Sequence, residues 1–120
     1  MRESKGDARA LFGSKAEERV VRHLEAGGYH ILARNFRTRL GEIDIVASRG
    51  RALHFVEVRA RASGAFLHPA ESVDFRKRQR IRRAAEQFLA RLRGPAPAEV
   101  FFDVASVIGD DLDYRKGAFE

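Results

Sequence analysis

Apolar residues near the start of the chain recur at the spacing of a helix. Leu24 follows Val21 by three positions and Val20 by four, so the three side chains share one face of a helix over residues 11–26. A pair of glycines comes directly afterwards and ends this helix.

Three short runs of β-branched and aromatic residues follow, separated by turn residues. They span residues 29–36, 42–47 and 53–61. This composition predicts strands, and their close succession predicts a meander. Residues 62–72 contain a glycine and a proline, and we expect them to form a loop.

The second half of the chain predicts a longer amphipathic helix and one or two further strands. Asp74 is suited to cap a helix that runs to residue 93, where a Gly-Pro pair ends it. Its apolar positions recur at helical spacing and are Ile81, Ala84, Ala85, Phe88, Leu89 and Leu92. Residues 99–108 then predict a fourth strand, and residues 112–115 a short fifth one.

This order of elements is typical of an α/β domain in which helices pack on a sheet. A length of 120 residues suits one domain, which we assign to residues 11–120, with residues 1–10 as a flexible polar tail.

The chain has no cysteine, which excludes disulfides, cysteine-ligated metal centres and cysteine nucleophiles. No apolar run approaches the ~18 residues that cross a membrane, and the start of the chain is charged. We therefore expect a cytoplasmic protein with no membrane partner.

The excess positive charge is confined to one segment. The chain carries 23 Lys+Arg and 17 Asp+Glu, a net charge of +6. Residues 73–93 hold eight basic and two acidic residues, so the rest of the chain is neutral. This pattern favours a polyanionic partner. The alternative is a solvated helix face, which we expect for Arg78 and Arg82.

The cations that we expect to contact phosphates come from this segment and from the loops before it. They are Arg37, Arg39, Arg61, Arg76, Lys77, Arg80 and Arg83, and Arg34 would extend the patch. Because phosphate contacts carry no sequence information, we expect selectivity for nucleic-acid structure rather than for base sequence.

Three carboxylates stand where the pattern prefers an apolar residue. Asp44 and Glu57 are each flanked by β-branched residues within a predicted strand, and Glu17 shares the apolar face of the first helix. Glu18 faces the polar side of that helix, so Glu17 is the preferred inward-pointing acid. An unpaired carboxylate in a protein core is costly, so these three acids are candidate functional residues.

Strand geometry relates these acids to one another. If the strands of Asp44 and Glu57 pair in antiparallel fashion, the two carboxylates can converge, and Arg59 shares the strand face of Glu57. Two close carboxylates repel each other, which favours a divalent cation between them. Oxygen ligands with room for water suit Mg²⁺ or Mn²⁺, and such an ion can activate water at a phosphate. The alternative is a solvent-facing surface on which Glu57 and Arg59 form an exposed ion pair of little energetic value.

Seven short blocks of sequence occur in order along residues 11–119. They are Gly13-x-x-x-Glu17, Leu24-x-x-x-Gly28-Tyr29, Ala33-Arg34-Asn35-Phe36-Arg37, Gly41-Glu42-Ile43-Asp44-Ile45, Phe55-Val56-Glu57-Val58-Arg59-x-Arg61, Val73-Asp74-x-x-Lys77 and Phe102-Asp103-Val104. Together they resemble the YraN-like family of small bacterial proteins. That family is similar in fold to restriction-endonuclease-like nucleases and, within them, to archaeal-type Holliday-junction resolvases.

The resemblance implies a restriction-endonuclease-like fold with a mixed sheet of four to five strands. It also implies an active site made of an Asp, a Glu-x-Lys on the next strand and an acid from the first helix. Carried over, Asp44 and Glu57 would be metal-binding acids, Glu17 the helix acid, and the backbone carbonyl of Val58 a further ligand. Arg59 stands where the nuclease pattern has lysine.

Arg59 leaves two functions open. Arginine keeps its proton at working pH and cannot act as a general base, but it can stabilise a charged transition state. One function is a Mg²⁺- or Mn²⁺-dependent endodeoxyribonuclease acting on branched or structured DNA, with Glu17, Asp44, Glu57 and Arg59 as catalytic residues. The alternative is a nucleic-acid-binding module, with little or no catalysis, on a nuclease scaffold. A third interpretation is an adaptor for a protein partner. A homodimer would suit the two symmetric cuts of a junction resolvase.

Three other residues receive structural interpretations. We expect Asp103 to have a structural role, such as pairing with a nearby arginine, and His54 to be structural. Gly41 either permits a close approach before Asp44 or simply ends a turn.

Overall fold

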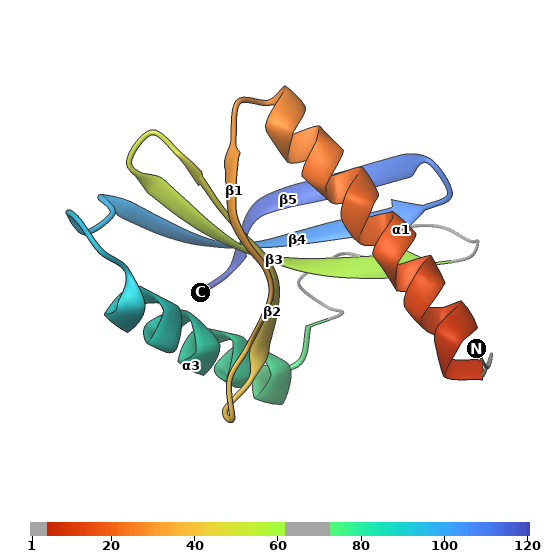
Figure 1. Ribbon diagram of the computed structural model, residues 1–120, viewed down its shortest axis with the longest axis horizontal. Helices are drawn as coiled ribbons and strands as arrows, with labels where there is room; N and C mark the ends of the chain where they lie inside the picture. Colours follow the sequence, from red (N-terminus) through yellow and green to blue (C-terminus); the bar gives the residue numbers. More distant parts are fainter. Residues whose placement is uncertain (1–4, 62–72) are drawn as a thin grey trace.

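The computed structural model describes residues 5–61 and 73–120, in which a five-stranded sheet has one helix on each face. The elements are α1 (Lys5–Ala26), β1 (His30–Arg37), β2 (Glu42–Arg49), β3 (Ala52–Arg61), α3 (Phe75–Arg91), β4 (Glu99–Ile108) and β5 (Asp111–Phe119). Figure 1 shows α1 and α3 on opposite sides of the sheet. The predicted loop 62–72 lies outside the described residues.

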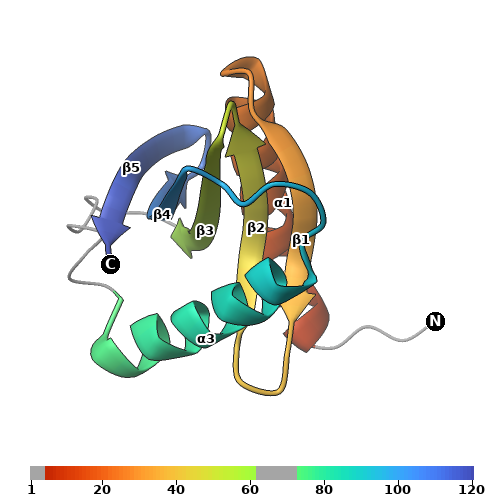
Figure 2. The ribbon, with the colours of Figure 1, turned by 90° about the vertical axis from the view of Figure 1, so that its left-hand side faces the viewer.

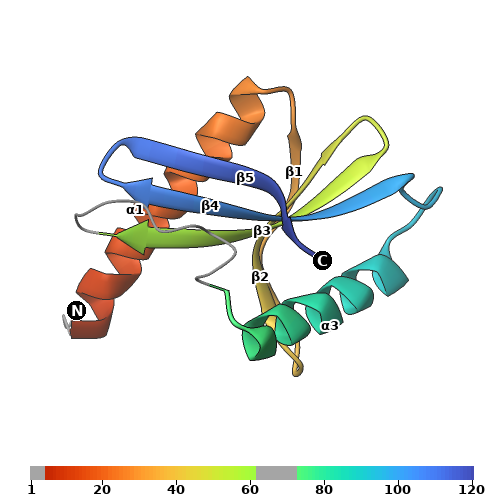
Figure 3. The same ribbon diagram turned by 180° about the vertical axis from the view of Figure 1, so that it is seen from behind.

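The sheet is mixed, with its strands in the order of the sequence. β1, β2 and β3 pair in antiparallel fashion, which confirms the predicted meander. β3 and β4 are parallel because the chain crosses over through α3 between them. β5 pairs in antiparallel fashion with β4 at the outer edge, as the view from behind shows (Figure 3). The predicted α/β class and element order are therefore confirmed, and the fifth strand is longer than predicted.

The boundaries of the helices differ from the sequence prediction at two points. α1 begins at Lys5, so residues 5–10, which we assigned to a tail, are helical. Ala8, Arg9 and Ala10 are good helix formers, but this stretch also contains Gly6 and Asp7 and has no apolar periodicity, so the sequence pattern did not predict a helix here. Asp74 caps α3 as predicted and accepts a hydrogen bond from the Lys77 backbone N–H at 2.8 Å, but the helix ends at Arg91 rather than at residue 93.

Side chains of β3 alternate between two separate cores. Leu53 and Phe55 pack toward α3, whereas Val56 packs toward α1. Figure 2 shows α3 crossing one face of the meander while α1 lies behind it. Glu57 follows Phe55 at the same parity and therefore continues the α3 side of β3. Within the described residues, neither helix combines the length and apolar character needed to cross a membrane.

Candidate active site

Asp44 and Glu57 meet where the pairing of β2 with β3 ends. The last register pair is Ile45 with Val56, so the next positions outward are Asp44 and Glu57. At this point the backbone N–H of Val58 donates a hydrogen bond to Asp44 Oδ2 at 2.7 Å. The Asp44 carboxylate thus serves as acceptor for a backbone group at the end of the ladder, which holds it beside Glu57.

The two acids perturb each other. Burial raises the pKa of Asp44 to about 7, and the charge of Glu57 and a hydrogen bond between the two carboxyl groups add to this effect. The Val58 N–H and the Lys77 ammonium act in the opposite direction on the pKa of Asp44. Asp44 therefore holds its proton more tightly than an ordinary carboxyl group, as expected when two acids share one site.

Two cations contact the second acid of the pair. Lys77 Nζ lies 2.6 Å from Glu57 Oε2, and Arg59 Nε lies 3.3 Å from the same oxygen. The Glu57 side chain is only 7% exposed, so the alternative of a solvent-facing Glu57–Arg59 pair is wrong. Lys77 comes from α3, so this helix supplies an ammonium to the strand acids.

A cavity of about 680 Å³ opens over these acids. Its walls are the β1–β2 hairpin and the first turns of α3. The residues lining it are Arg37, Thr38, Arg39, Leu40, Gly41, Glu42, Asp44, Glu57, Val58, Asp74, Lys77, Arg80 and Ile81. Four of the predicted phosphate-binding cations, namely Arg37, Arg39, Lys77 and Arg80, therefore lie around Asp44 and Glu57.

The other predicted cations lie elsewhere. Arg76 and Arg83 are exposed on α3 but do not line this cavity, and the side chain of Arg61 lies outside the described residues. Arg78 and Arg82 are half-buried, so the expectation that both stand on a solvated face is wrong. The reason is that the basic segment wraps more than one face of α3.

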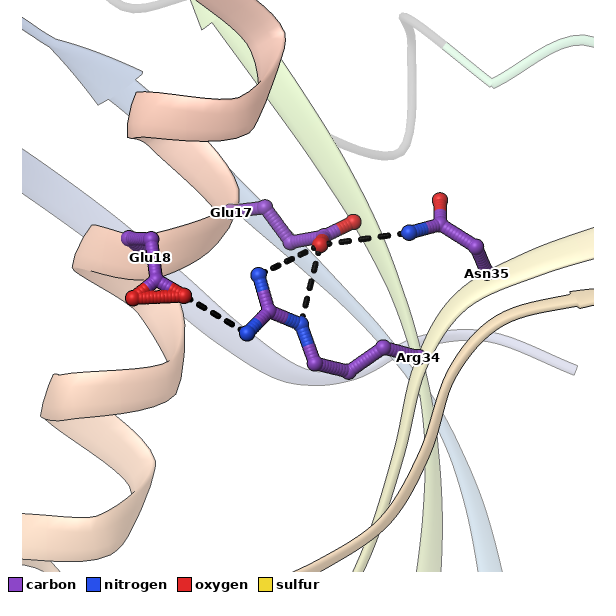
Figure 4. A network of polar contacts seen from close by, with 4 residues as sticks. All are labelled: Glu17, Glu18, Arg34 and Asn35. Atoms are coloured by element: carbon purple, nitrogen blue, oxygen red, sulfur yellow. Dashed lines mark hydrogen bonds and ion pairs between the residues drawn. The ribbon is translucent and has the colours of Figure 1, made fainter.

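Arg34 does not extend the cationic patch, because it holds α1 to β1. Its Nη2 lies 2.7 Å from Glu17 Oε1, and its Nη1 lies 2.6 Å from Glu18 Oε1 (Figure 4). These hydrogen bonds raise the pKa of Arg34, so it stays charged. Glu17 is 8% exposed, which confirms that it points inward.

Glu17 does not join the other two acids in one tight cluster. Among the described residues, no group of three or more His, Asp or Glu side chains is placed to hold a metal ion. Instead, Glu17 lines a neighbouring cavity of about 360 Å³ together with Ser14, Asn35, Arg37, Asp44, Val58 and Ala60. Arg37, Asp44 and Val58 line both cavities, so they form the boundary between them.

The Asp44–Glu57 pair suits a divalent cation of the magnesium type. Mg²⁺ usually takes one or two protein carboxylates and keeps several waters, rather than filling a complete protein cage. Burial is the main cause of the raised pKa of Asp44 and the charge of Glu57 adds to it, so an ion between the two carboxylates would relieve their mutual repulsion. The Lys77 ammonium would have to share Glu57 with such an ion or move from it.

Gly41 fixes the hairpin against α3. A Cβ atom built at this position would overlap the carbonyl oxygen of Arg80, so only glycine allows the two backbones to approach so closely. This confirms the close approach that was one of the two interpretations of Gly41. Sequence reasoning missed Thr38, whose hydroxyl donates to the Gly41 carbonyl at 3.0 Å and accepts from the Gly41 N–H.

Asp103 has partners that differ from the predicted arginine. It accepts hydrogen bonds from the Tyr114 hydroxyl and from the Gly117 N–H, and its Oδ2 lies 2.7 Å from His54 Nδ1. The structural roles expected for Asp103 and His54 fit this buried network, but the pairing with arginine is wrong. Tyr114 lies in the predicted fifth strand, but its meeting with Asp103 depends on how β5 pairs with β4, which the sequence pattern does not give.

Comparison with known proteins identifies the relatives of this chain. Residues 16–107 match the family described as "Uncharacterised protein family UPF0102". A UPF0102 protein of Chlorobaculum tepidum is 47% identical over 103 residues, covering 86% of this chain and 79% of the relative. One of Halorhodospira halophila is 46% identical over 107 residues, covering 89% of this chain and 85% of the relative. One of Persephonella marina is 37% identical over 108 residues, covering 90% and 92% respectively.

The family match covers most of the chain, and it includes the strands that carry Asp44 and Glu57 and the helix that carries Lys77. The chain therefore belongs to the UPF0102 family, the YraN-like proteins that its sequence blocks resemble.

Proposed function

We propose that this protein is a divalent-metal-dependent nuclease that hydrolyses phosphodiesters in branched or structured DNA. One observation carries the proposal: a half-buried carboxylate, Asp44, and a buried one, Glu57, meet at the base of a cavity whose walls are rich in arginine and lysine. Acids that favour an added cation, placed beside cations that favour a polyanion, suit metal-assisted chemistry on a phosphate.

Each residue has a distinct role in this proposal. Asp44 and Glu57 would hold Mg²⁺ or Mn²⁺, with the Val58 carbonyl as a further ligand. Such an ion would lower the pKa of a water and neutralise charge on the phosphate. Glu17 would accept a hydrogen bond from a water in the adjoining cavity. Arg59 stabilises the negative charge that develops during hydrolysis.

The wall of the cavity is suited to the phosphate backbone rather than to base edges. Arg37 and Arg39 come from the hairpin, and Lys77 and Arg80 come from α3, so two separate elements can grip one strand. Arginine and lysine contacts to phosphates make binding strongly dependent on salt. Among these cations stands Leu40, an apolar side chain that is 45% exposed and available to contact an unpaired base. A homodimer that presents two such sites would suit a two-fold junction.

The test is cleavage of labelled four-way junction, flap, single-stranded and duplex DNA with Mg²⁺ or Mn²⁺. Asp44→Asn and Glu57→Gln keep the size of each side chain and remove its charge. We expect the wild type to cut at least one branched substrate and both variants to lose cutting by at least ~100-fold, while still shifting the same DNA on a gel. Cutting that persists in both variants would contradict the assignment of these acids.

A second function is favoured by the arrangement of Lys77. Its ammonium lies 2.6 Å from Glu57, and Arg59 replaces the lysine of the nuclease pattern, so the site is already neutralised in part by the chain itself. A nucleic-acid-binding module without catalysis would have this property. It predicts unchanged binding in Asp44→Asn, weaker binding in Lys77→Gln and no cutting by wild type with either metal.

A further inference from the structure

Asn35 has an unusual backbone conformation. Its φ is 53°, the single positive value at a residue other than glycine in the part of the chain that the structure describes. This left-handed conformation is strained for residues with a Cβ atom, although asparagine tolerates it better than most. Strain of this kind persists where the surrounding structure enforces it, and it gathers at functional sites. It is therefore a reason to ask what the Asn35 side chain contacts.

The position of Asn35 in the sheet places it next to the candidate active site. The register pairs on either side of it are Arg34 with Ile45 and Phe36 with Ile43. Asn35 therefore lies opposite Asp44 on the neighbouring strand. It also lines the cavity of about 360 Å³ that Asp44 shares with Glu17. Asn35 therefore lines the same cavity as Asp44 and Glu17.

The amide of Asn35 contacts Glu17 and not Asp44. Asn35 Nδ2 donates to Glu17 Oε1 at 3.3 Å, and the Arg34 guanidinium donates to the same oxygen at 3.0 and 2.7 Å. Figure 4 shows the three bonds meeting on one oxygen of Glu17, while Oε2 lies on the side of the carboxylate away from Arg34. Glu17 is thus held by one oxygen, and the other can accept from a molecule in the shared cavity.

We propose that Asn35 is a positioning residue that orients Glu17 into the cavity beside Asp44. The left-handed backbone turns the amide toward α1, where it completes the set of donors on Glu17 Oε1. Glu17 Oε2 is then left to accept a hydrogen bond in the cavity that Asp44 also lines, where it would contact a ligand of the ion that Asp44 and Glu57 would hold. This inference rests on the proposed function, and it assigns Asn35 a part in metal binding through Glu17.

A purely structural role for Asn35 makes a different prediction, and two variants separate the two roles. Asn35→Ala removes the amide and keeps the strain, so it lowers stability. Asn35→Gly removes the amide and relieves the strain, because glycine adopts positive φ freely. If the role of Asn35 is only structural, metal affinity changes only where stability changes, so Asn35→Gly should bind metal as tightly as wild type. In a positioning role, both variants lose metal affinity, although only Asn35→Ala loses stability.

The experiment measures Mn²⁺ affinity by calorimetry and stability by urea unfolding for the same set of proteins. Partners that orient metal ligands typically contribute 10–100-fold to metal affinity, so we expect a loss of about tenfold in both Asn35 variants. Glu17→Gln should show a similar loss, and adding Asn35→Gly to it should cause little further change. Leu32→Ala is the matched control on the same strand, because this side chain is 45% exposed and lines neither cavity.

The outcomes separate this inference from the proposed function. Mn²⁺ affinity reduced about tenfold in Asn35→Gly, with stability equal to or above wild type, supports the positioning role. Wild-type affinity in Asn35→Gly, in a protein that binds Mn²⁺ and cuts DNA, overturns this inference alone. A wild type that neither binds Mn²⁺ nor cuts DNA overturns the proposed function, and this inference with it.

Discussion

The sheet holds two acid sites whose surroundings differ in kind: Asp103 alone, and the pair formed by the half-buried Asp44 and the buried Glu57. Asp103 is fully buried and accepts hydrogen bonds from Tyr114 and Gly117, with His54 as a third partner. The His54 ring in turn packs between Tyr29 and Phe101. Every oxygen of Asp103 is thus matched by a donor group of the protein, and the result is a closed polar network.

The Asp44–Glu57 pair is matched in a different way. Its two members are both acceptors, they face each other, and they line an open cavity. Lys77 and Arg59 compensate the charge of Glu57 in part, while burial and the charge of Glu57 raise the pKa of Asp44, so Asp44 keeps a proton more readily than an ordinary carboxyl group. Burial of an acid therefore does not by itself indicate function. The informative feature is whether the protein supplies the compensating positive groups or leaves room for them.

The largest expected effect comes from breaking the closed network. Asp103→Ala removes the acceptor of the Tyr114 hydroxyl and the partner of His54, and leaves buried polar groups unpaired. We expect the free energy of unfolding to fall by about 3–5 kcal/mol, measured by urea unfolding. Asp44→Asn should leave stability equal or higher, because it removes repulsion between acids. Equal losses in the two variants would contradict the comparison.

The next effect concerns the wall of the open cavity. Gly41→Ala places a Cβ atom on the carbonyl of Arg80, so the hairpin must move away from α3. We expect a loss of about 1–3 kcal/mol in the free energy of unfolding and weaker DNA binding. Gly27→Ala is the control, because its Cβ atom would meet only ordinary contacts and its φ is not positive. Tight DNA binding by Gly41→Ala would show that the hairpin position is unimportant.

A third prediction uses pH to distinguish the two acid groups. The folded-state pKa of Asp44 is raised from 3.8 to about 7, so the native state binds this proton more tightly than the unfolded chain. The resulting stabilisation is fully present below about pH 4, falls as pH rises, and is lost above about pH 7. In metal-free buffer, the Tm of wild type should therefore decrease relative to that of Asp44→Asn over this range. A constant difference in Tm between the two proteins would contradict the raised pKa.

The smallest effect concerns a single cation of the wall. Lys77→Gln removes one ammonium beside Glu57, so DNA binding should weaken a few-fold at moderate salt. The slope of log affinity against log salt should fall by about one, as expected for one phosphate contact. Arg93→Gln is the control, since Arg93 is exposed beyond α3 and does not line this cavity. An identical salt slope in wild type and Lys77→Gln would remove Lys77 from the interface.

The sequence predicted those features that depend on local pattern. Asp44 and Glu57 interrupt apolar strands, and Glu17 shares an apolar helix face, so each could be identified from its neighbours. The cap at Asp74 follows from the same kind of local signal. The convergence of Asp44 with Glu57 followed because two successive strands in a meander must pair.

Other features depend on contacts between distant segments and gave no local signal. The partners of Asp103 lie on β3 and β5, and their meeting requires the complete strand order. The ion pairs of Arg34 with Glu17 and Glu18 depend on how α1 crosses β1. The conformation of Asn35 depends on the β1–β2 pairing, so a sequence pattern shows only that asparagine could adopt it.

The central claim is that Asp44 and Glu57 form a pair left open for a divalent cation. The most direct measurement is a crystal structure of the wild-type protein soaked with Mn²⁺, with anomalous scattering used to locate the metal. We predict a peak between the two carboxylates, loss of their mutual hydrogen bond, and absence of the peak in Asp44→Asn. Crystals with no Mn²⁺ peak at this pair, and with Asp44 still hydrogen-bonded to Glu57, would contradict the claim.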